Sequence, residues 1–333
     1  MIGYYVHHVG AGHLRRAHAV ALRAGVPVTG LSSLPAPPGW PGPWVRLALD
    51  DVARRAVDPT AGGLLHWVPM GDDGLRARMT TLSAWIDAAR PDALVSDVSV
   101  EVTLLARLHG VPVVSFVLPG RRGDRAHRSA YAVSSALIAA WPREATGMVH
   151  GLARTDRHRL HHIGGLSQLE VAGHHVRARR RTVLVLSGRG GGHPSAEEVR
   201  AAEADAPGWS WQVLGGPGRW VDDPSTAMAA ADVVVMQAGE SAVADVAACR
   251  RPAVVVPAAR PFEEQRATAR ALREDRWPCR VEARFPSTGW AERLTDVAAL
   301  DGRAWEPWCD GLAADRLVEV LEGFTDRGRR SIA

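Results

Sequence analysis

The sequence predicts an α/β protein with two successive parallel-sheet domains that face one another across a cleft. Short apolar runs of strand length alternate with helical patterns in both halves of the chain, and this alternation is typical of parallel sheets joined by right-handed crossovers. The length of 333 residues suits about two domains of roughly 150 residues each. A polar, glycine-bearing stretch, 164–181, separates the two halves and predicts an interdomain linker.

The first domain is expected to span residues 1–165 and to be Rossmann-like. Apolar runs predict its strands at Ile2–Val9, Val26–Leu31, Ala93–Val95 and Val111–Val117. Leu137–Trp141 and the stretch around Met148 are expected to close this half. Helical spacing predicts helices at Leu14–Ala24, Leu75–Ala89 and Glu101–His109. The prolines of segment 35–43 exclude regular structure there, because proline fixes φ and removes a backbone donor. Solvated loops or linker are expected for the arginine-rich segments Arg121–Arg128, Arg154–Arg159 and Arg177–Arg181.

The second domain, also Rossmann-like, is expected to span 182–333 after a linker over 166–181. Apolar runs predict its strands at Thr182–Leu186, Trp209–Leu214, Val233–Met236 and Ala253–Val256. Helical patterns predict helices at Ser195–Ala204, Ser241–Cys249, 262–274, 289–299 and 310–323. Ser195 and Glu198 have the spacing of a capping box at a helix start.

The composition is that of a water-soluble globular protein, with 46% hydrophobic and 23% charged residues. No apolar run approaches the roughly 20 residues needed to span a bilayer, and the N-terminus has no basic leader, so a cytoplasmic protein is expected. The three cysteines are far apart and have neither zinc nor disulfide spacing. The net charge of +4 is spread over separate arginine clusters, so no nucleic-acid partner is expected. No sequence feature indicates an oligomeric state.

Glycine and polar residues follow three strands of the second domain, where ligands of open α/β sheets bind. Backbone N–H groups at helix starts favour phosphate, and glycine permits close approach. Asp245 lies one turn beyond Ser241, so its carboxylate could accept both ribose hydroxyls. Plain tight turns, solvated side chains and dipole compensation remain the alternatives. The predicted nucleotide-sugar ligands are Ser187, Gly188, Arg189, Gly190, Gln237, Gly239, Glu240, Ser241, Asp245, Glu263, Glu264 and Gln265.

His13 is the candidate catalytic base of the first domain. It follows the first strand in the turn Gly10-Ala11-Gly12-His13, and its ordinary pKa of about 6.5 suits deprotonation of a hydroxyl near neutral pH. Asp97, after another strand, is the candidate to orient His13 or to bind the acceptor. A polar helix-start residue and a helix N-cap are the respective alternatives. His7 and His8 are expected to be structural.

No metal site is expected. No paired-acid motif follows a strand of the second domain, and Asp222-Asp223 precedes a proline in what resembles a helix-entry turn. A dinucleotide oxidoreductase is rejected, because the first glycine turn lacks the third glycine of the G-x-G-x-x-G fingerprint and no acidic residue clearly ends the second strand.

Four segments together resemble the MurG-like glycosyltransferases of the GT-B fold, which include the enzyme that adds N-acetylglucosamine to lipid I. The segments are Gly10–His13 with Arg16-Ala17, His162–Leu166, Ser187–Gly191, and Gly239–Asp245 followed by Pro257 and Glu264-Gln265. The resemblance implies an inverting, metal-independent hexosyltransferase that needs no cofactor and uses a nucleotide diphosphate sugar, with UDP as the default. It also implies that the last helix packs back on the first domain.

The chain departs from the family pattern at Ala242, Asp245 and Thr268, where threonine, glutamate and asparagine are usual. Residues 35–75 match no part of the pattern, so the acceptor is an unidentified small molecule or glycan. Trp40, Trp44 and Trp67 could stack on it or form loop core. Two other functions stay open, a sugar-nucleotide 2-epimerase of the same fold and a non-catalytic GT-B partner subunit.

Overall fold

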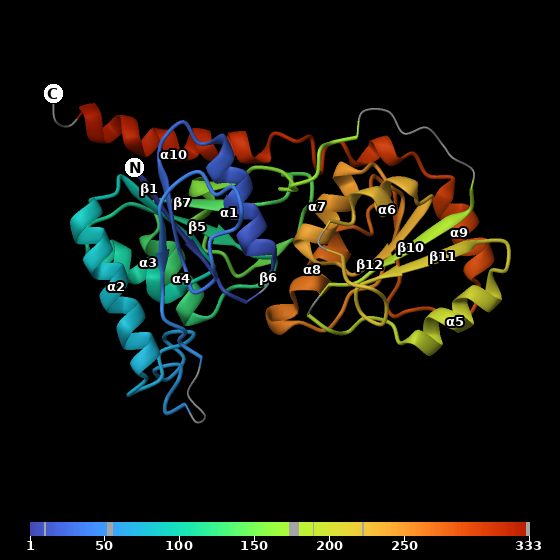
Figure 1. Ribbon diagram of the computed structural model, residues 1–333, viewed down its shortest axis with the longest axis horizontal. Coiled ribbons are helices and arrows are strands. Elements are labelled where there is room, and N and C mark those ends of the chain that lie inside the picture. Colours follow the sequence, from blue (N-terminus) through green and yellow to red (C-terminus); the bar gives the residue numbers. More distant parts are fainter. Residues whose placement is uncertain (10, 52–55, 173–179, 189, 222, 331–333) are drawn as a thin grey trace.

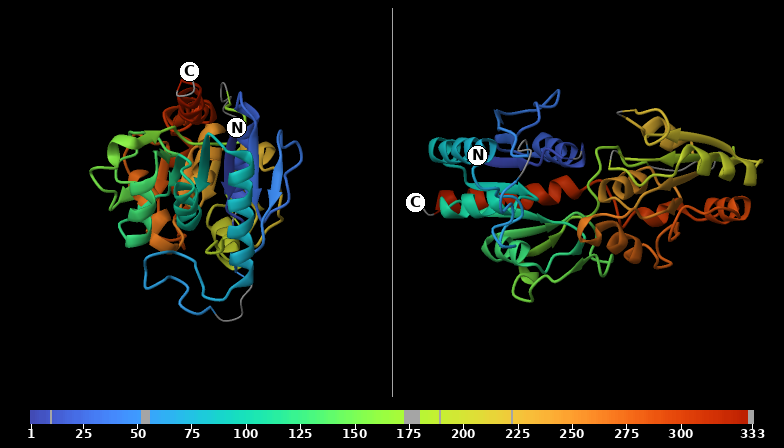
Figure 2. Two further views of the ribbon diagram at one scale, coloured as in Figure 1. Left: turned by 90° about the vertical axis from the view of Figure 1, so that its left-hand side faces the viewer. Right: turned by 90° about the horizontal axis from the view of Figure 1, so that it is seen from below.

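Two parallel sheets organise the protein and lie side by side along its long axis (Figure 1). The computed structural model describes residues 1–9, 11–51, 56–172, 180–188, 190–221 and 223–330. No strand of one sheet is hydrogen-bonded to a strand of the other among the described residues. Helices cover each sheet, as the right-hand view of Figure 2 also shows. The predicted α/β class with two Rossmann-like sheet units is therefore confirmed.

The first sheet has seven parallel strands in the order β3-β2-β1-β4-β5-β7-β9. Its central strands are buried along their whole length, because helices cover both faces of a parallel sheet. The strands are β1 (Ile2–Val6), β2 (Val28–Ser32), β3 (Trp44–Arg46), β4 (Ala93–Asp97), β5 (Val113–Val117), β7 (Ala136–Ala139) and β9 (Leu160–His162). The other elements of this half are α1 (Ala11–Arg23), α2 (Asp73–Ala89), α3 (Val100–Leu108), α4 (Arg125–Val133), η1 (Arg157–Arg159) and the short pair β6 (Gly120–Arg121) and β8 (Val149–His150).

The second sheet has five parallel strands in the order β11-β10-β12-β13-β14. They are β10 (Thr182–Leu186), β11 (Ser210–Leu214), β12 (Val233–Met236), β13 (Ala253–Val255) and β14 (Cys279–Val281). The helices are α5 (Ala196–Asp205), α6 (Ser225–Ala230), α7 (Glu240–Ala248), α8 (Glu264–Ala271), α9 (Trp290–Ala298) and α10 (Ala313–Arg330), with η2 (Pro261–Glu263) and η3 (Gly302–Trp305). The predicted capping box at Ser195 and Glu198 opens α5.

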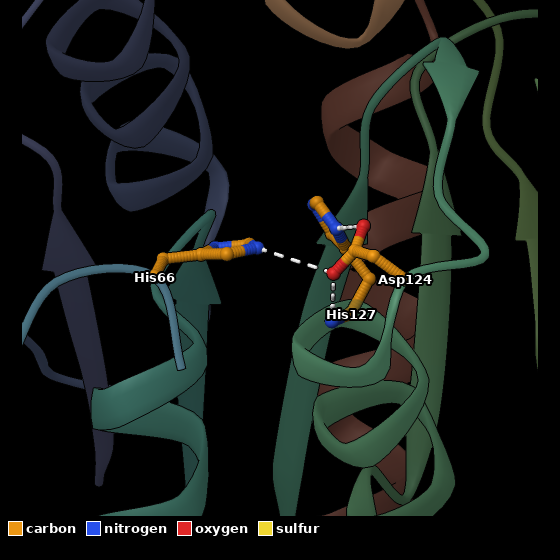
Figure 3. A group of neighbouring side chains, drawn as sticks. All are labelled: His66, Asp124 and His127. Atoms are coloured by element: carbon orange, nitrogen blue, oxygen red, sulfur yellow. Dashed lines mark hydrogen bonds and ion pairs between the residues drawn. The ribbon is translucent and has the colours of Figure 1, made fainter. Parts of the chain in front are cut away.

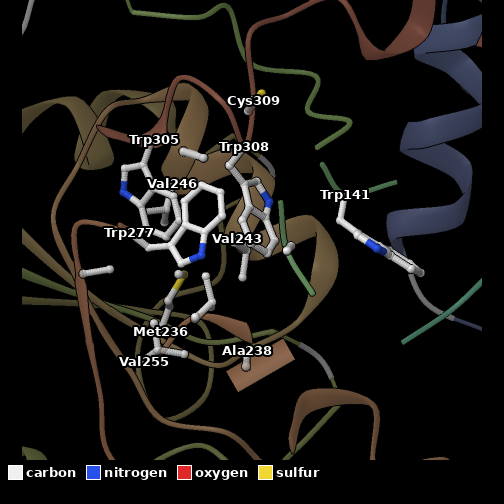
Figure 4. Packing of buried hydrophobic residues seen from close by; sticks show 14 of the residues in the cluster. Trp141, Met236, Ala238, Val243, Val246, Val255, Trp277, Trp305, Trp308 and Cys309 are labelled. Carbon is white, nitrogen blue, oxygen red and sulfur yellow. The ribbon is translucent and has the colours of Figure 1, made fainter. Parts of the chain in front are cut away.

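Tryptophan rings fill one side of the second sheet (Figure 4). Trp277, Trp305 and Trp308 are buried, and the rings of Trp277 and Trp308 meet edge to face at 4.9 Å between centroids. The same buried cluster contains Trp141 and Val117 of the first half. Apolar packing is therefore continuous between the two halves, and it supports the relative position of their strand ends.

Helix α10 follows the second sheet in the chain but runs along the first half (Figures 1 and 2). Leu317 and Leu321 are buried in the cluster that also contains Val20 of α1. Arg23 of α1 pairs with Asp315 of α10 at 2.7 Å. The chain consequently passes between the halves twice, once before β10 and once before α10.

The predicted loop at Arg121–Arg128 is wrong, because helix α4 begins at Arg125. Asp124 caps that helix by accepting a hydrogen bond from the His127 backbone N–H at 3.1 Å. Arg122 is buried rather than solvated. The sequence did not predict the helix start or the buried arginine, because a run of charged residues usually indicates a solvent-exposed loop. Part of the third arginine cluster, 177–179, lies outside the described residues.

Candidate functional site

Two cavities meet at His13, between the strand ends of the two sheets. The first, here called the ring-lined cavity, has a volume of about 380 Å³ and lies mainly among residues of the first half. The second, here called the turn-lined cavity, has a volume of about 350 Å³ and is enclosed by turns of the second half and the start of α1. His13, Leu118 and Glu264 line both. A group bound in either cavity is therefore within reach of His13.

The turn-lined cavity gathers most of the residues that the sequence predicted to bind a nucleotide sugar. They are Ser187, Gly188, Gly190, Gln237, Gly239, Glu240, Ser241, Asp245, Glu264 and Gln265. Glu263 does not line it; its carboxylate lies 3.1 Å from Arg121 on another surface. Arg189 lies outside the described residues. Trp220, Arg15 and Arg260 also line this cavity and were not predicted.

The starts of helices α1 and α7 approach each other at this cavity. Gly239 is the N-cap of α7 and, among the described residues, no side chain caps that helix start. The helix begins at Glu240, one residue earlier than predicted. A Cβ atom at Gly12 would come within 2.6 Å of the Ser241 Oγ, so glycine is what allows this approach. Uncapped N–H groups at a helix start favour an anion such as a diphosphate.

A buried chain of charges connects the two halves behind His13. Asp97 ends β4 and is fully buried; its Oδ1 lies 3.0 Å from His13 Nδ1. Arg16 contacts Asp97 at 3.3 Å and Glu240 of α7 at 2.8 Å. Because buried charges are stable only when paired, Arg16 joins a carboxylate of each half into one network.

Burial and pairing shift the pKa values of these acids in opposite directions. Burial alone would raise the pKa of Asp97, but Arg16 and His13 hold that pKa below its usual value. Burial raises the pKa of Glu240 to about 7, although Arg16 opposes this. Asp97 is therefore an anion at neutral pH, whereas Glu240 titrates near neutrality.

Asp245 is a buried side chain of α7 and not the solvated helix acid that stood as the alternative. It accepts a hydrogen bond from Ser167 Oγ at 2.6 Å, and Arg15 lies 3.9 Å away. Burial raises the pKa of Asp245 to about 6. A second oxygen of a carboxylate that lines a cavity can accept hydroxyl hydrogens of a ligand.

The two glutamines of the turn-lined cavity are held by backbone groups. Gln265 Oε1 accepts a hydrogen bond from the Ala258 N–H at 2.8 Å. Gln237 Nε2 donates to the Gly191 carbonyl oxygen at 2.8 Å. Each bond fixes the amide orientation. The Gln265 amide NH₂ is thereby left to serve as a donor beside Gly239, whose added Cβ would lie 3.8 Å from it.

Apart from His13 and Glu264, the ring-lined cavity is formed by residues that the sequence did not predict as site residues. Four of its rings are His66, His127, Tyr131 and Phe262. Phe262 comes from η2 of the second half and lies 4.9 Å from the His127 ring, centroid to centroid. These residues are far apart in the chain, so no local motif could have joined them.

None of the three tryptophans that could have stacked on an acceptor lines this cavity. Trp40 and Trp44 pack edge to face at 4.8 Å and against the core of the first half. Trp67 donates its ring N–H to the Asp50 carbonyl oxygen. The loop-core alternative therefore describes them.

Two side-chain groups in the described chain have the atom types of metal ligands. One comprises His66, Asp124 and His127, whose side chains point toward one another (Figure 3). The other comprises His8, Asp50 and Asp51. In the first group, the Asp124 carboxylate lies 2.5 Å from His127 Nδ1 and 3.6 Å from His66 Nε2.

No helix among the described residues has the length and apolar character to cross a membrane.

Comparison with known proteins identifies the fold. Residues 219–279 match the model of the glycosyltransferase family 28 C-terminal domain. A UDP-N-acetylglucosamine–N-acetylmuramyl-(pentapeptide) pyrophosphoryl-undecaprenol N-acetylglucosamine transferase from Chlorobium luteolum is 32% identical over 117 residues. That match spans only about a third of each chain, 32% of this one and 32% of the relative.

Solved structures resemble the chain over nearly its whole length. Acinetobacter baumannii MurG is 17% identical, with a TM-score of 0.60 over 97% of this chain and 99% of that one. The glycosyltransferase of kitacinnamycin is 16% identical, with a TM-score of 0.64 over 97% and 98%. SsfS6 from Streptomyces sp. SF2575, solved with thymidine diphosphate, is 13% identical, with a TM-score of 0.54 over 97% and 99%. The chain therefore has the GT-B fold, and the predicted resemblance to MurG-like glycosyltransferases is confirmed.

Proposed function

We propose that this chain, whose GT-B fold carries a family 28 segment in its second half, is an inverting, metal-independent glycosyltransferase. It would move a hexose from a nucleotide diphosphate sugar, UDP by default, to a hydroxyl group of an acceptor. The observation that carries this proposal is the position of His13, which lines both cavities while its Nδ1 faces the buried Asp97 carboxylate.

In this proposal the donor occupies the turn-lined cavity. The diphosphate lies at the uncapped start of α7, near Gly239, Glu240 and Ser241. Asp245 accepts the ribose hydroxyls, and the Gln265 amide binds the sugar. Thymidine diphosphate in the SsfS6 structure supports a diphosphate nucleotide on this fold. The ligand set also includes Ser187, Gly188, Arg189, Gly190, Gln237, Glu263 and Glu264, of which Glu263 has the weakest support because it lies outside the cavity.

His13 is the proposed general base. We place the ring proton of His13 on Nδ1, which lies 3.0 Å from Asp97 Oδ1, and this tautomer leaves the Nε2 lone pair free to take the proton of the acceptor hydroxyl. The acceptor oxygen then attacks the anomeric carbon, and the bond to the nucleotide diphosphate breaks on the opposite face. One displacement inverts the configuration at that carbon. Positive charge for the leaving diphosphate would come from the α7 start and from Arg15 and Arg260, which line the cavity, and this supports metal independence.

The division of labour follows the two sheets. We infer that residues 1–165 form the acceptor domain, 166–181 the linker and 182–333 the donor domain, with α10 packed back on the first. Closure of the cleft on the donor would bring His13 toward the anomeric carbon.

The three cysteines are free, which supports a reducing cytoplasmic location.

The test is a donor assay that needs no acceptor. The protein is incubated with UDP-sugars and TDP-sugars, and nucleotide release and thermal stability are measured. Slow hydrolysis with one donor, together with a rise in melting temperature larger than uridine produces, is the expected result. Stabilisation without hydrolysis by any donor would favour the non-catalytic partner subunit. Release of a free 2-epimeric sugar or sugar nucleotide would favour the epimerase.

A further inference from the structure

The ring-lined cavity offers aromatic faces to a ligand. The centroid of the His127 ring lies 4.2 Å from that of His66, 4.9 Å from that of Phe262 and 5.8 Å from that of Tyr131. These are the separations of edge-to-face and offset ring pairs. All four residues also line the cavity, so a flat ligand there would extend a ring cluster that already exists.

The charge on the cavity wall is compensated. Arg122 is the one arginine among the described residues that line this cavity. It is paired with Glu264, and its guanidinium carbon lies 4.7 Å from the centroid of the Phe262 ring. Burial lowers the pKa of His127 to about 4, so that ring is neutral at pH 7. A diphosphate or another anion would find no uncommitted arginine among the described residues of this wall.

The histidine–aspartate group at the rim is better suited to a rigid wall than to a metal ion (Figure 3). Both ring nitrogens of His127 already have partners, Asp124 at Nδ1 and Arg122 at 3.0 Å from Nε2. To coordinate His127, a metal ion would have to displace Asp124 or Arg122 from its ring nitrogen. If Arg122 moved, its ion pair with Glu264 would be disturbed as well. The hydrogen bonds instead fix the plane of the His127 ring.

Phe262 reaches this cavity through a strained backbone. Both Phe262 and Glu263 have left-handed φ values, 56° and 57°, a conformation that residues other than glycine rarely adopt. A Cβ atom at Gly120 would lie 2.2 Å from the Phe262 carbonyl oxygen, so glycine leaves room for this turn. The turn directly precedes Glu264 and Gln265 of the turn-lined cavity. It therefore connects the two cavities from the second half.

Resting on the glycosyltransferase proposal above, we propose that the acceptor is an uncharged aromatic alcohol or phenol of one to three fused rings. It lies against His66, His127, Tyr131 and Phe262, with its hydroxyl at His13. A volume of about 380 Å³ is at the small end of cavities that hold such molecules. Phe262 is a specificity-determining residue, which the donor half supplies to the acceptor site.

The experiment compares 2-naphthol with its saturated counterpart, decahydro-2-naphthol, by calorimetry in the presence of UDP. The wild-type protein should bind 2-naphthol about 3–10-fold more tightly, which is the range of one aromatic ring pair. Phe262→Leu keeps an apolar side chain and should abolish most of this preference, while the affinity for UDP stays within about twofold. Leu300→Ala, at a partly exposed apolar residue outside both cavities, is the control and should keep the preference.

Equal affinity for the two alcohols, no binding of either, or a preference that survives Phe262→Leu would overturn this inference. So would tighter binding of farnesyl diphosphate than of 2-naphthol, or a preference that EDTA removes and Zn²⁺ restores. The outcome is separate from that of the proposed function. Donor hydrolysis combined with transfer only to saturated or anionic acceptors would leave the glycosyltransferase intact and remove the aromatic acceptor.

Discussion

The two cavities that meet at His13 are built from different kinds of structure. The turn-lined cavity includes five glycines and the start of α7, where no side chain caps the helix among the described residues. The ring-lined cavity has a ring cluster on its wall, with His66 from the loop before α2, His127 and Tyr131 from α4, and Phe262 from η2. Backbone N–H groups at a helix start suit any diphosphate, whereas a wall of side chains can be suited to one particular ligand.

This difference predicts which substitutions affect one substrate and which affect both. His13 belongs to both cavities, and Arg16 connects Asp97 of one half with Glu240 of the other. Asp245 belongs to the turn-lined cavity alone, and Phe262 to the ring-lined cavity alone. Variants at shared positions should therefore damage turnover or folding, and variants at the others should change the affinity for a single ligand.

The largest effect is expected for His13→Ala. Loss of the proposed general base should lower turnover by about 10²–10⁴-fold, while the affinity for the donor should change little because most residues of the proposed donor site belong to the other half. The rise of the rate with pH near the histidine pKa should disappear as well. Steady-state kinetics and donor titration measure both quantities. Near-normal turnover would remove the base from His13, and Asp97 could not replace it because it is fully buried and lines neither cavity. His13→Gln controls for lost hydrogen bonding.

Removal of Arg16 should mainly lower stability. Arg16→Met leaves Asp97 and Glu240 buried near each other without their cation, and such unpairing typically costs about 3–5 kcal/mol in the free energy of unfolding. Urea unfolding at pH 8 measures it. Arg15→Met, on the same helix but with a partly exposed side chain 3.9 Å from its carboxylate, should cost less than about 1 kcal/mol. Equal losses for the two variants would contradict a special role of the buried network.

The same contrast explains what the sequence could and could not predict. Strand, turn and helix of the Gly239–Asp245 segment are local features, so the sequence pattern alone was enough to place Gln237, Ser241 and Asp245 at one cavity. Arg16 is noticeable in the sequence only because it follows the turn Gly10–His13. Its ion pair with Glu240 could not be predicted, because it depends on how the two halves pack.

The ring-lined cavity was not predictable for the same physical reason. His66 and Phe262 are brought together by the packing of the two halves, and no period or motif in the sequence encodes that contact. The run of arginines around Arg122 predicted a solvent-exposed loop. In the folded protein the buried Arg122 side chain instead binds Glu264 and the Pro119 carbonyl oxygen. A charged side chain can be buried when the fold brings an oppositely charged residue from a distant part of the chain to pair with it.

Asp245→Ala should weaken donor binding without affecting the acceptor. If Asp245 binds the ribose hydroxyls as proposed, its loss should lower the affinity for UDP by about 10–100-fold, the range for hydrogen bonds to a charged group. The sharper control is 2′,3′-dideoxy-UDP, which should bind the wild type and the variant equally. Asp296→Ala, at an exposed acid of α9, should leave UDP affinity unchanged. A similar loss for UDP and its dideoxy analogue would move Asp245 away from the ribose.

The smallest effect concerns the pH dependence of stability at Glu240. Its pKa in the folded protein is raised to about 7, mainly by burial, whereas an unfolded glutamate ionises near 4.5. Between these values the folded state holds more protons, so this group lowers the free energy of unfolding as pH rises, and the loss is complete above pH 7. Asp245, with a pKa of about 6, acts with the same sign at lower pH.

The measurement is therefore the difference between the wild type and Glu240→Gln in urea unfolding from pH 6 to pH 7.5. Histidines act with the opposite sign, since burial lowers the pKa of His7 and His127 to about 4, but their contribution cancels in the difference. The wild type should lose about 1 kcal/mol more than the variant over this range. Arg16, Asp97, Glu264 and His13 all interact electrostatically with Glu240. If the pair with Arg16 outweighed burial, the folded pKa of Glu240 would lie below 4.5, and the difference between wild type and variant would stay constant over this range.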